Sequence, residues 1–203
     1  MRGFAFGCAA TVAVVLVARS FAGGSGDAVV PESRLTTLYR HDPLRCAISL
    51  ATGEDGHFIA DNYIHNRASD LDFGSYNTDA FTIGIEGGRK GVLVDLGSVG
   101  DIAKRFNYVE PVGGGEGYAS IHFAGGALLI TRDVEKTFQS IPESKQLLGT
   151  SAAGASLPVI TGHIYLARLV DARDPTFERM AKILVVSHLA GESVTIRWDI
   201  LTR

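Results

Sequence analysis

The segment formed by residues 193–200 alternates between apolar and polar side chains without interruption. A period of two is the period of an extended strand, in which successive side chains point to opposite faces, and it does not fit a helix. The alternation therefore predicts a half-buried β-strand. Its apolar face would carry Val194, Ile196, Trp198 and Ile200, and its polar face Thr195, Arg197 and Asp199.

Two further predicted strands, residues 163–170 and 182–189, come shortly before this one. The links between the strands, residues 171–175 and 190–192, are short and contain Gly, Pro and Asp, which favour turns. Neighbouring strands joined by short links form an antiparallel meander. We therefore expect the C-terminal part of the chain to be one antiparallel sheet.

The rest of the chain is also rich in predicted strands. Residues 87–90 are predicted to form a hairpin turn between the strands at 80–86 and 91–96. Two helices are expected, one capped by Ser98 and running to Phe106, and one beginning at Asp133 and ending at Pro142. This balance predicts a mostly β fold, an antiparallel sandwich or partly open barrel with one or two short helices. The remaining predicted strands are residues 45–51, 57–64, 70–73, 118–123 and 127–131.

The N-terminus has the pattern of a secretory signal peptide. Arg2 precedes an apolar stretch at residues 3–18, and small residues at positions 20 and 22 offer a cleavage site. The apolar stretch is shorter than the roughly 20 residues that a spanning helix needs. We therefore expect a signal peptide at 1–22, a linker at 23–34 and one β-rich domain at 35–203. The protein would be exported, and periplasmic, cell-surface or secreted; the alternative is an uncleaved N-terminal anchor, its only membrane contact.

Charge and cysteine content narrow the possible partners. The formal net charge is −3, and removal of the N-terminal segment would take away Arg2 and Arg19. An acidic domain lacks the basic surface that nucleic-acid binding requires, so no nucleic-acid partner is expected. Of the two cysteines only Cys46 would remain, which excludes an internal disulfide. Its apolar neighbours predict that this thiol is buried.

The motifs of common enzymes are incomplete. The glycine-rich residues 113–117 are followed by Tyr and Ala, not by the Lys-Ser/Thr pair of a phosphate-binding loop. Residues 149–153 lack the last glycine of the serine-hydrolase elbow. Asp70 and Asp72 share one side of a predicted strand, as paired carboxylates of a glycosidase would, but a solvated strand face explains them better. We assign no catalytic residue.

Six histidines offer another kind of site. Their spacings match neither a helical zinc motif nor a structural Cys–His zinc site, so no metal ligands are assigned. Histidines on neighbouring strands can still converge. His122 and His163, both in predicted strands, are the candidates for cofactor binding, with haem as the cofactor considered; the alternative is that the histidines are separate and structural.

Part of the C-terminal meander resembles a known family. Residues 162–165 (Gly-His-Ile-Tyr), 181–185 (Ala-Lys-Ile-Leu-Val) and 194–198 (Val-Thr-Ile-Arg-Trp) resemble the closing strands of HmuY-like exported β-proteins, and similar segments occur in bacterial envelope domains without an assigned role. The resemblance covers about the last forty residues. It implies an exported β-fold and haem binding through two histidines. The family's ligand positions have no counterpart here, because the intervening region does not match.

These patterns together lead to one functional expectation and two alternatives. We expect an exported, non-catalytic β-domain that binds a partner or a small ligand through its loops at the cell envelope. One alternative is a haem- or metal-binding protein that uses histidines. The other is a hydrolase whose site requires carboxylates and a histidine to converge in the fold.

Overall fold

The computed structural model describes residues 34–56, 69–75, 78–84, 89–109, 117–132, 137–149 and 154–203. These residues belong to one compact unit, Pro31–Arg203. The predicted signal peptide, the predicted linker apart from Arg34, and the predicted strand at 57–64 lie outside the described residues.

The described residues form many strands and two short helices. In chain order the elements are β1 (Arg34–Tyr39), β2 (Ala47–Ile48), β3 (Asp55–Gly56), β4 (Leu71–Phe73), β5 (Ala80–Ile83), β6 (Arg89–Ser98), α1 (Val99–Phe106), β7 (Ile121–Ala124), β8 (Ala127–Thr131), β9 (Phe138–Ser140), α2 (Ser144–Leu148), β10 (Ser156–Pro158), β11 (His163–Asp171), β12 (Asp174–Leu189) and β13 (Ser193–Ile200).

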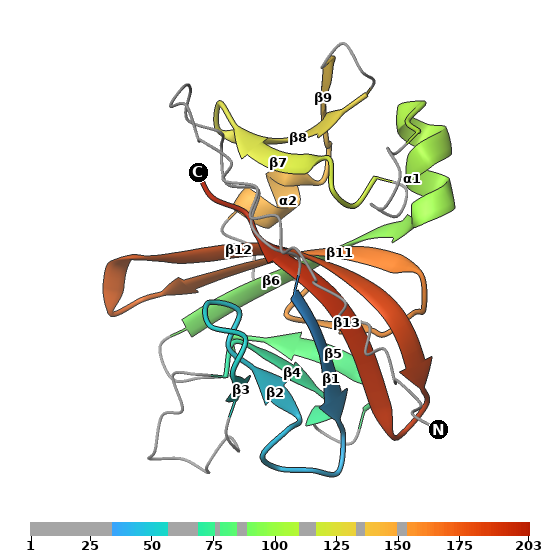
Figure 1. Ribbon diagram of the computed structural model, residues 1–203. Helices are drawn as coiled ribbons and strands as arrows, with labels where there is room; N and C mark the ends of the chain where they lie inside the picture. The colour runs from blue at the N-terminus through green and yellow to red at the C-terminus, as the bar shows by residue number, and fades with distance from the viewer. Residues whose placement is uncertain are drawn as a thin grey trace, which may run out of the picture. The chain divides into compact units, whose positions relative to one another are not determined.

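The strands form three antiparallel sheets. The central sheet has five strands in the order β1-β13-β12-β11-β6, and it contains the predicted C-terminal meander β11-β12-β13. A second five-stranded sheet has the order β10-β5-β4-β2-β3, and a small three-stranded sheet has the order β7-β8-β9. Figure 1 shows the second sheet on one side of the central sheet, and the small sheet with both helices on the other.

The two faces of the central sheet pack into two separate cores. In β6, Val92 and Val94 face the core beneath the small sheet and the helices, whereas Leu93 faces the core shared with the second sheet. The alternation of side chains along a strand explains why one strand supplies both cores. The predicted apolar face of β13 is confirmed, because Ile196 and Trp198 are fully buried against the second sheet.

The predicted fold class is therefore confirmed as a mostly β, antiparallel sandwich. The central and second sheets are its two layers, and they meet along β6. There the Leu93 amide of β6 donates to the carbonyl of Gly154 (2.7 Å), two residues before β10 of the second sheet. Among the described residues, no helix is long and apolar enough to span a membrane.

The predicted hairpin at residues 87–90 is wrong. Strands β5 and β6 lie in different sheets, where β5 pairs with β4 and β10, and β6 pairs with β11. The chain crosses between the layers here. A Cβ added at Gly91 would lie 2.5 Å from Ile83 Cγ2, so glycine is needed for the close approach of the layers. A turn signal in the sequence alone does not distinguish a hairpin from a change of sheet.

The predicted helix from Asp133 to Pro142 is also wrong over its described residues. Residues 138–140 form β9, in which Phe138 pairs with Thr131 of β8. The apolar spacing that favoured a helix is overridden by this pairing. Pro142 comes just before α2 and so precedes a helix instead of ending one. By contrast, α1 begins at the predicted cap, where the Ser98 hydroxyl accepts the Asp101 amide.

Candidate functional site

Connections between strands gather beside the turn of the β12–β13 hairpin. The segment after β1 turns tightly, because Asp42 Oδ1 accepts the Leu44 amide (3.0 Å) and the Tyr39 amide donates to the Arg45 carbonyl (3.0 Å). The hairpin turn is tied to this segment, since the Arg40 amide donates to the Glu192 carbonyl (2.8 Å). We call residues 39–46, 74–79 and 188–193 the loop end; residues 76 and 77 lie outside the described residues.

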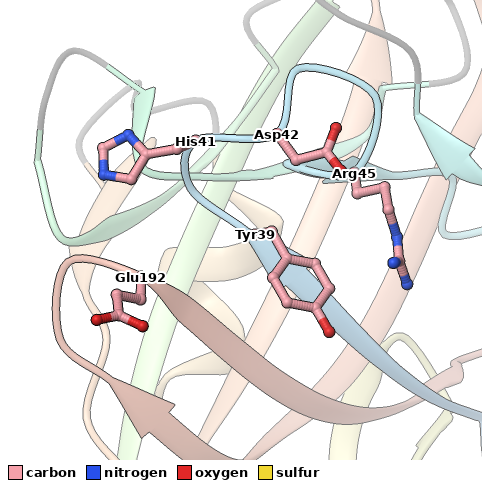
Figure 2. Close-up of a pocket in the computed structure, with 5 residues that line it drawn as sticks. All are labelled: Tyr39, His41, Asp42, Arg45 and Glu192. Atoms are coloured by element: carbon pink, nitrogen blue, oxygen red, sulfur yellow. The ribbon is translucent and has the colours of Figure 1, made fainter.

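The loop end contains an open pocket of about 770 Å³. In Figure 2, His41 and Glu192 lie to the left of the Tyr39 ring, Arg45 lies to its right, and Asp42 lies above it. The pocket therefore combines side chains from the β1–β2 segment with one from the β12–β13 turn. Its lining is Tyr39, His41, Asp42, Arg45 and Glu192.

The lining mixes an aromatic ring with both signs of charge. The Arg45 guanidinium lies 4.7 Å from the centroid of the Tyr39 ring, a cation–π contact that orients both side chains. Tyr39 is 39% exposed, so part of its ring is accessible to a ligand. Glu192 and His41 are also exposed. Such a surface offers hydrogen-bond donors, acceptors and a ring face together, which suits a polar ligand.

Asp79 anchors the hairpin to the second sheet. Its Oδ1 accepts the Gly191 amide (3.1 Å), and its Oδ2 lies 3.1 Å from His188 Nε2. The imidazole N–H is not aligned for a hydrogen bond, so the second contact is an ion pair when His188 is protonated. Burial acts to raise the pKa of Asp79, but His188, the Gly191 amide and Arg40 outweigh it and hold the pKa below 3.8.

The two predicted cofactor ligands lie in different sheets. His122 is in β7, where its Nδ1 is 3.1 Å from the Ser120 carbonyl and its ring packs on Phe138 at 5.1 Å. His163 begins β11 in the central sheet. Among the described residues no contact joins the two rings, and their joint binding of a cofactor stays a prediction.

His163 is paired with a carboxylate. Its Nδ1 lies 2.9 Å from Asp95 Oδ2 and 3.1 Å from Oδ1. A carboxylate at Nδ1 fixes the orientation of the imidazole, and Nε2 is then the nitrogen that accepts a proton in a general base or binds the metal in a metal ligand.

Ser98 is the register partner of His163. Its hydroxyl donates to Asp101 Oδ2 (2.7 Å), which lowers the pKa of Asp101 and directs the hydroxyl away from a nucleophile's role.

The interpretation of Asp70 and Asp72 as a solvated strand face is wrong. Both residues are buried, with exposed fractions of 2% and 4%. Asp70 Oδ1 accepts Arg89 Nη1 (2.7 Å), while Oδ2 accepts the Leu50 amide (2.9 Å) and pairs with Arg179. Asp72 lies within 3.4 Å of the Ser69 hydroxyl. The Asp70 carboxylate thus has a structural role in the sandwich.

Cys46, expected to be buried, is partly exposed and is a free thiol. Burial, and then the charge of Asp72, raise the pKa of the thiol from 9.0 to about 11. The side chain is therefore protonated at neutral pH, which makes it a poor nucleophile and a poor metal ligand. Within the described ranges, no group of at least three His, Cys, Asp or Glu side chains is arranged to hold a metal ion.

The pocket residues were not predicted from the sequence, although a signal was present. Arg40-His41-Asp42-Pro43 is a charged run that ends in Asp-Pro, a sequence that favours a turn. The strand before it, β1, was not expected, so nothing placed this run beside the β12–β13 turn. Comparisons with family models, with curated proteins and with solved structures found no match to this chain.

Proposed function

We propose that the protein is an exported, non-catalytic β-domain that binds a small polar ligand or a partner at the loop end, in the cell envelope. The observation that carries the proposal is the pocket lined by Tyr39, His41, Asp42, Arg45 and Glu192. Export rests on the signal-peptide pattern of residues 1–22.

The chemistry of the lining supports binding. Loops carried by a rigid sandwich are common places for recognition, because the sheet fixes their ends. Tyr39 offers a ring for stacking, and the charged side chains around it provide hydrogen bonds of both kinds. The lining has no pair of nucleophile and base in contact among its described side chains, and this favours recognition over catalysis.

Binding is tested by amide chemical-shift mapping on the purified protein. The probes are individual amino acids, polyamines, mono- and disaccharides, and short peptides of each charge type. The proposal expects at least one probe to give saturable shifts centred on Tyr39 and Glu192, and these shifts to disappear in Tyr39→Ala. A matched control is Phe138→Ala, because Phe138 is equally an exposed aromatic residue of a strand but belongs to the small sheet. Shifts that survive Tyr39→Ala, or that centre elsewhere, would contradict the proposal.

A second candidate function is haem or metal binding, and one observation favours it. The Asp95 carboxylate holds Nδ1 of His163, which is how a ligating imidazole is commonly oriented. The test is a titration with haemin, followed by visible absorbance. A saturable Soret shift that is lost in His163→Ala supports this candidate, and the His122→Ala variant shows whether the second predicted histidine takes part. A flat titration would contradict haem binding.

A further inference from the structure

The β12–β13 turn is held by a side chain from a distant part of the sequence. Asp79 directly precedes β5 of the second sheet. Its Oδ1 accepts a hydrogen bond from the Gly191 amide, and its Oδ2 lies 3.1 Å from His188 Nε2. His188 is itself fixed, because its ring packs edge-on against Phe73 at 5.8 Å and 89°. A single carboxylate thus contacts both the end of β12 and the turn that follows it.

Arg40 connects the same turn to the segment after β1. Its amide donates to the Glu192 carbonyl (2.8 Å), and its guanidinium lies over Gly191, where an added Cβ would be 3.5 Å from Nη1. The stem of Arg40 lies on Gly74, since a Cβ at Gly74 would be only 2.4 Å from Arg40 Cγ. Arg40 therefore contacts the hairpin turn and the segment after β4 at once.

We propose that Asp79 is the positioning residue of the pocket: it fixes the β12–β13 turn, and through the Arg40–Glu192 contact it sets the position of Glu192 against Tyr39, His41, Asp42 and Arg45. This inference rests on the proposed function only in treating the pocket as a binding site. The positioning itself is a property of the unliganded protein.

The β12–β13 turn needs a residue that holds it in place, because the turn has few apolar contacts of its own. The turn, Ala190-Gly191-Glu192, is largely exposed and carries little apolar area of its own. Without apolar packing, an exposed turn opens easily. A carboxylate that accepts an amide is a charge-assisted hydrogen bond, and these are the stronger ones. Asp79 thus supplies order to a turn that the hydrophobic core does not reach.

The test is native-state amide hydrogen exchange on the purified protein, without a ligand. In Asp79→Ala, the amides of Gly191 and Arg40 are expected to exchange about tenfold faster or more. Asp79→Asn keeps an oxygen for the Gly191 amide but loses the charge, so a smaller acceleration is expected. The matched control is Asp174→Ala, because Asp174 also accepts a nearby amide, that of Thr176 (2.9 Å), at the far end of β12.

The amide of Leu93, which donates to the Gly154 carbonyl where the two layers meet, is the reference for opening elsewhere in the sandwich. Acceleration at Gly191 and Arg40 with Leu93 unchanged supports the inference. Unchanged exchange at Gly191 in Asp79→Ala overturns it, and so does equal acceleration at all three amides, which would mean a general loss of stability. Because no ligand is used, these outcomes are independent of whether the pocket binds any of the probes in the shift mapping.

Discussion

Asp70 is a buried carboxylate that pairs with two arginine side chains. Its side chain is fully buried. The Arg89 side chain is 4% exposed, and the Arg179 side chain is 26% exposed. The Arg89 and Arg179 guanidinium groups both lie against the Phe177 ring, at 4.5 and 4.8 Å. A buried charge that loses its partner keeps its desolvation penalty, so such a network is sensitive to the removal of one member.

Asp70→Ala is therefore expected to lower the free energy of unfolding by about 3–5 kcal/mol, because it leaves Arg89 without its nearest carboxylate and the Leu50 amide without its acceptor. The matched control is Arg105→Ala, which breaks the surface pair with Glu143 (2.6 Å) and is expected to cost less than about 1 kcal/mol. Urea unfolding measures both. Similar losses in the two variants would contradict the structural role given to Asp70.

Cys46 is expected to react slowly with alkylating reagents. A thiol pKa of about 11 in place of 9.0 reduces the thiolate fraction near pH 8, by about a hundredfold for a shift of this size. The measurement is the pH dependence of iodoacetamide alkylation in a chain with Cys8→Ser, where Cys46 is the only thiol. A rate that levels off below pH 9 would show that burial and Asp72 do not act on the thiol as described.

At the scale of elements, the sequence predicted strands best where apolar side chains face a core. The faces of β6 and β13 follow from alternation alone, because each strand has a core on at least one side. The α1 cap follows from the Ser98 side chain. The position of β9 could not be predicted, because among the described strands it pairs with β8 alone and its side chains are exposed. The pairing of β5 with β10 joins residues far apart in sequence, which local patterns do not encode.

The β12–β13 hairpin should respond to acid through Asp79. The pKa of Asp79 is lowered in the folded protein, so its contribution to stability is fully present above the unfolded pKa of about 3.9. That contribution is lost as the pH falls through the lower, folded pKa. Asp79→Asn should therefore be less stable than wild type near pH 6 and should show a shallower decline below about pH 4. Urea unfolding across this range measures the slope, and equal slopes would contradict the assignment.

At the scale of the whole molecule, the candidate site arises from topology. Tyr39 and Glu192 are far apart in sequence but lie together because β1 pairs with β13, with Tyr39 opposite Ser193. Asp79 joins them from the second sheet, through a contact between layers. Composition and periodicity predicted a mostly β fold, either an antiparallel sandwich or a partly open barrel. They could not predict the pocket, because its residues come from turns whose neighbours depend on strand order.

The central claim, that the loop end is the binding surface, is tested most directly by photo-crosslinking in intact producing cells. A photoreactive amino acid replaces His41 in the pocket in one variant, and Val109 in the other, which is 87% exposed and follows α1. If the ligand or partner binds at the loop end, position 41 gives a discrete adduct that is absent from position 109 and is lost when Tyr39→Ala is added. Adducts from position 109 alone, or an adduct at position 41 that is unaffected by Tyr39→Ala, would contradict it.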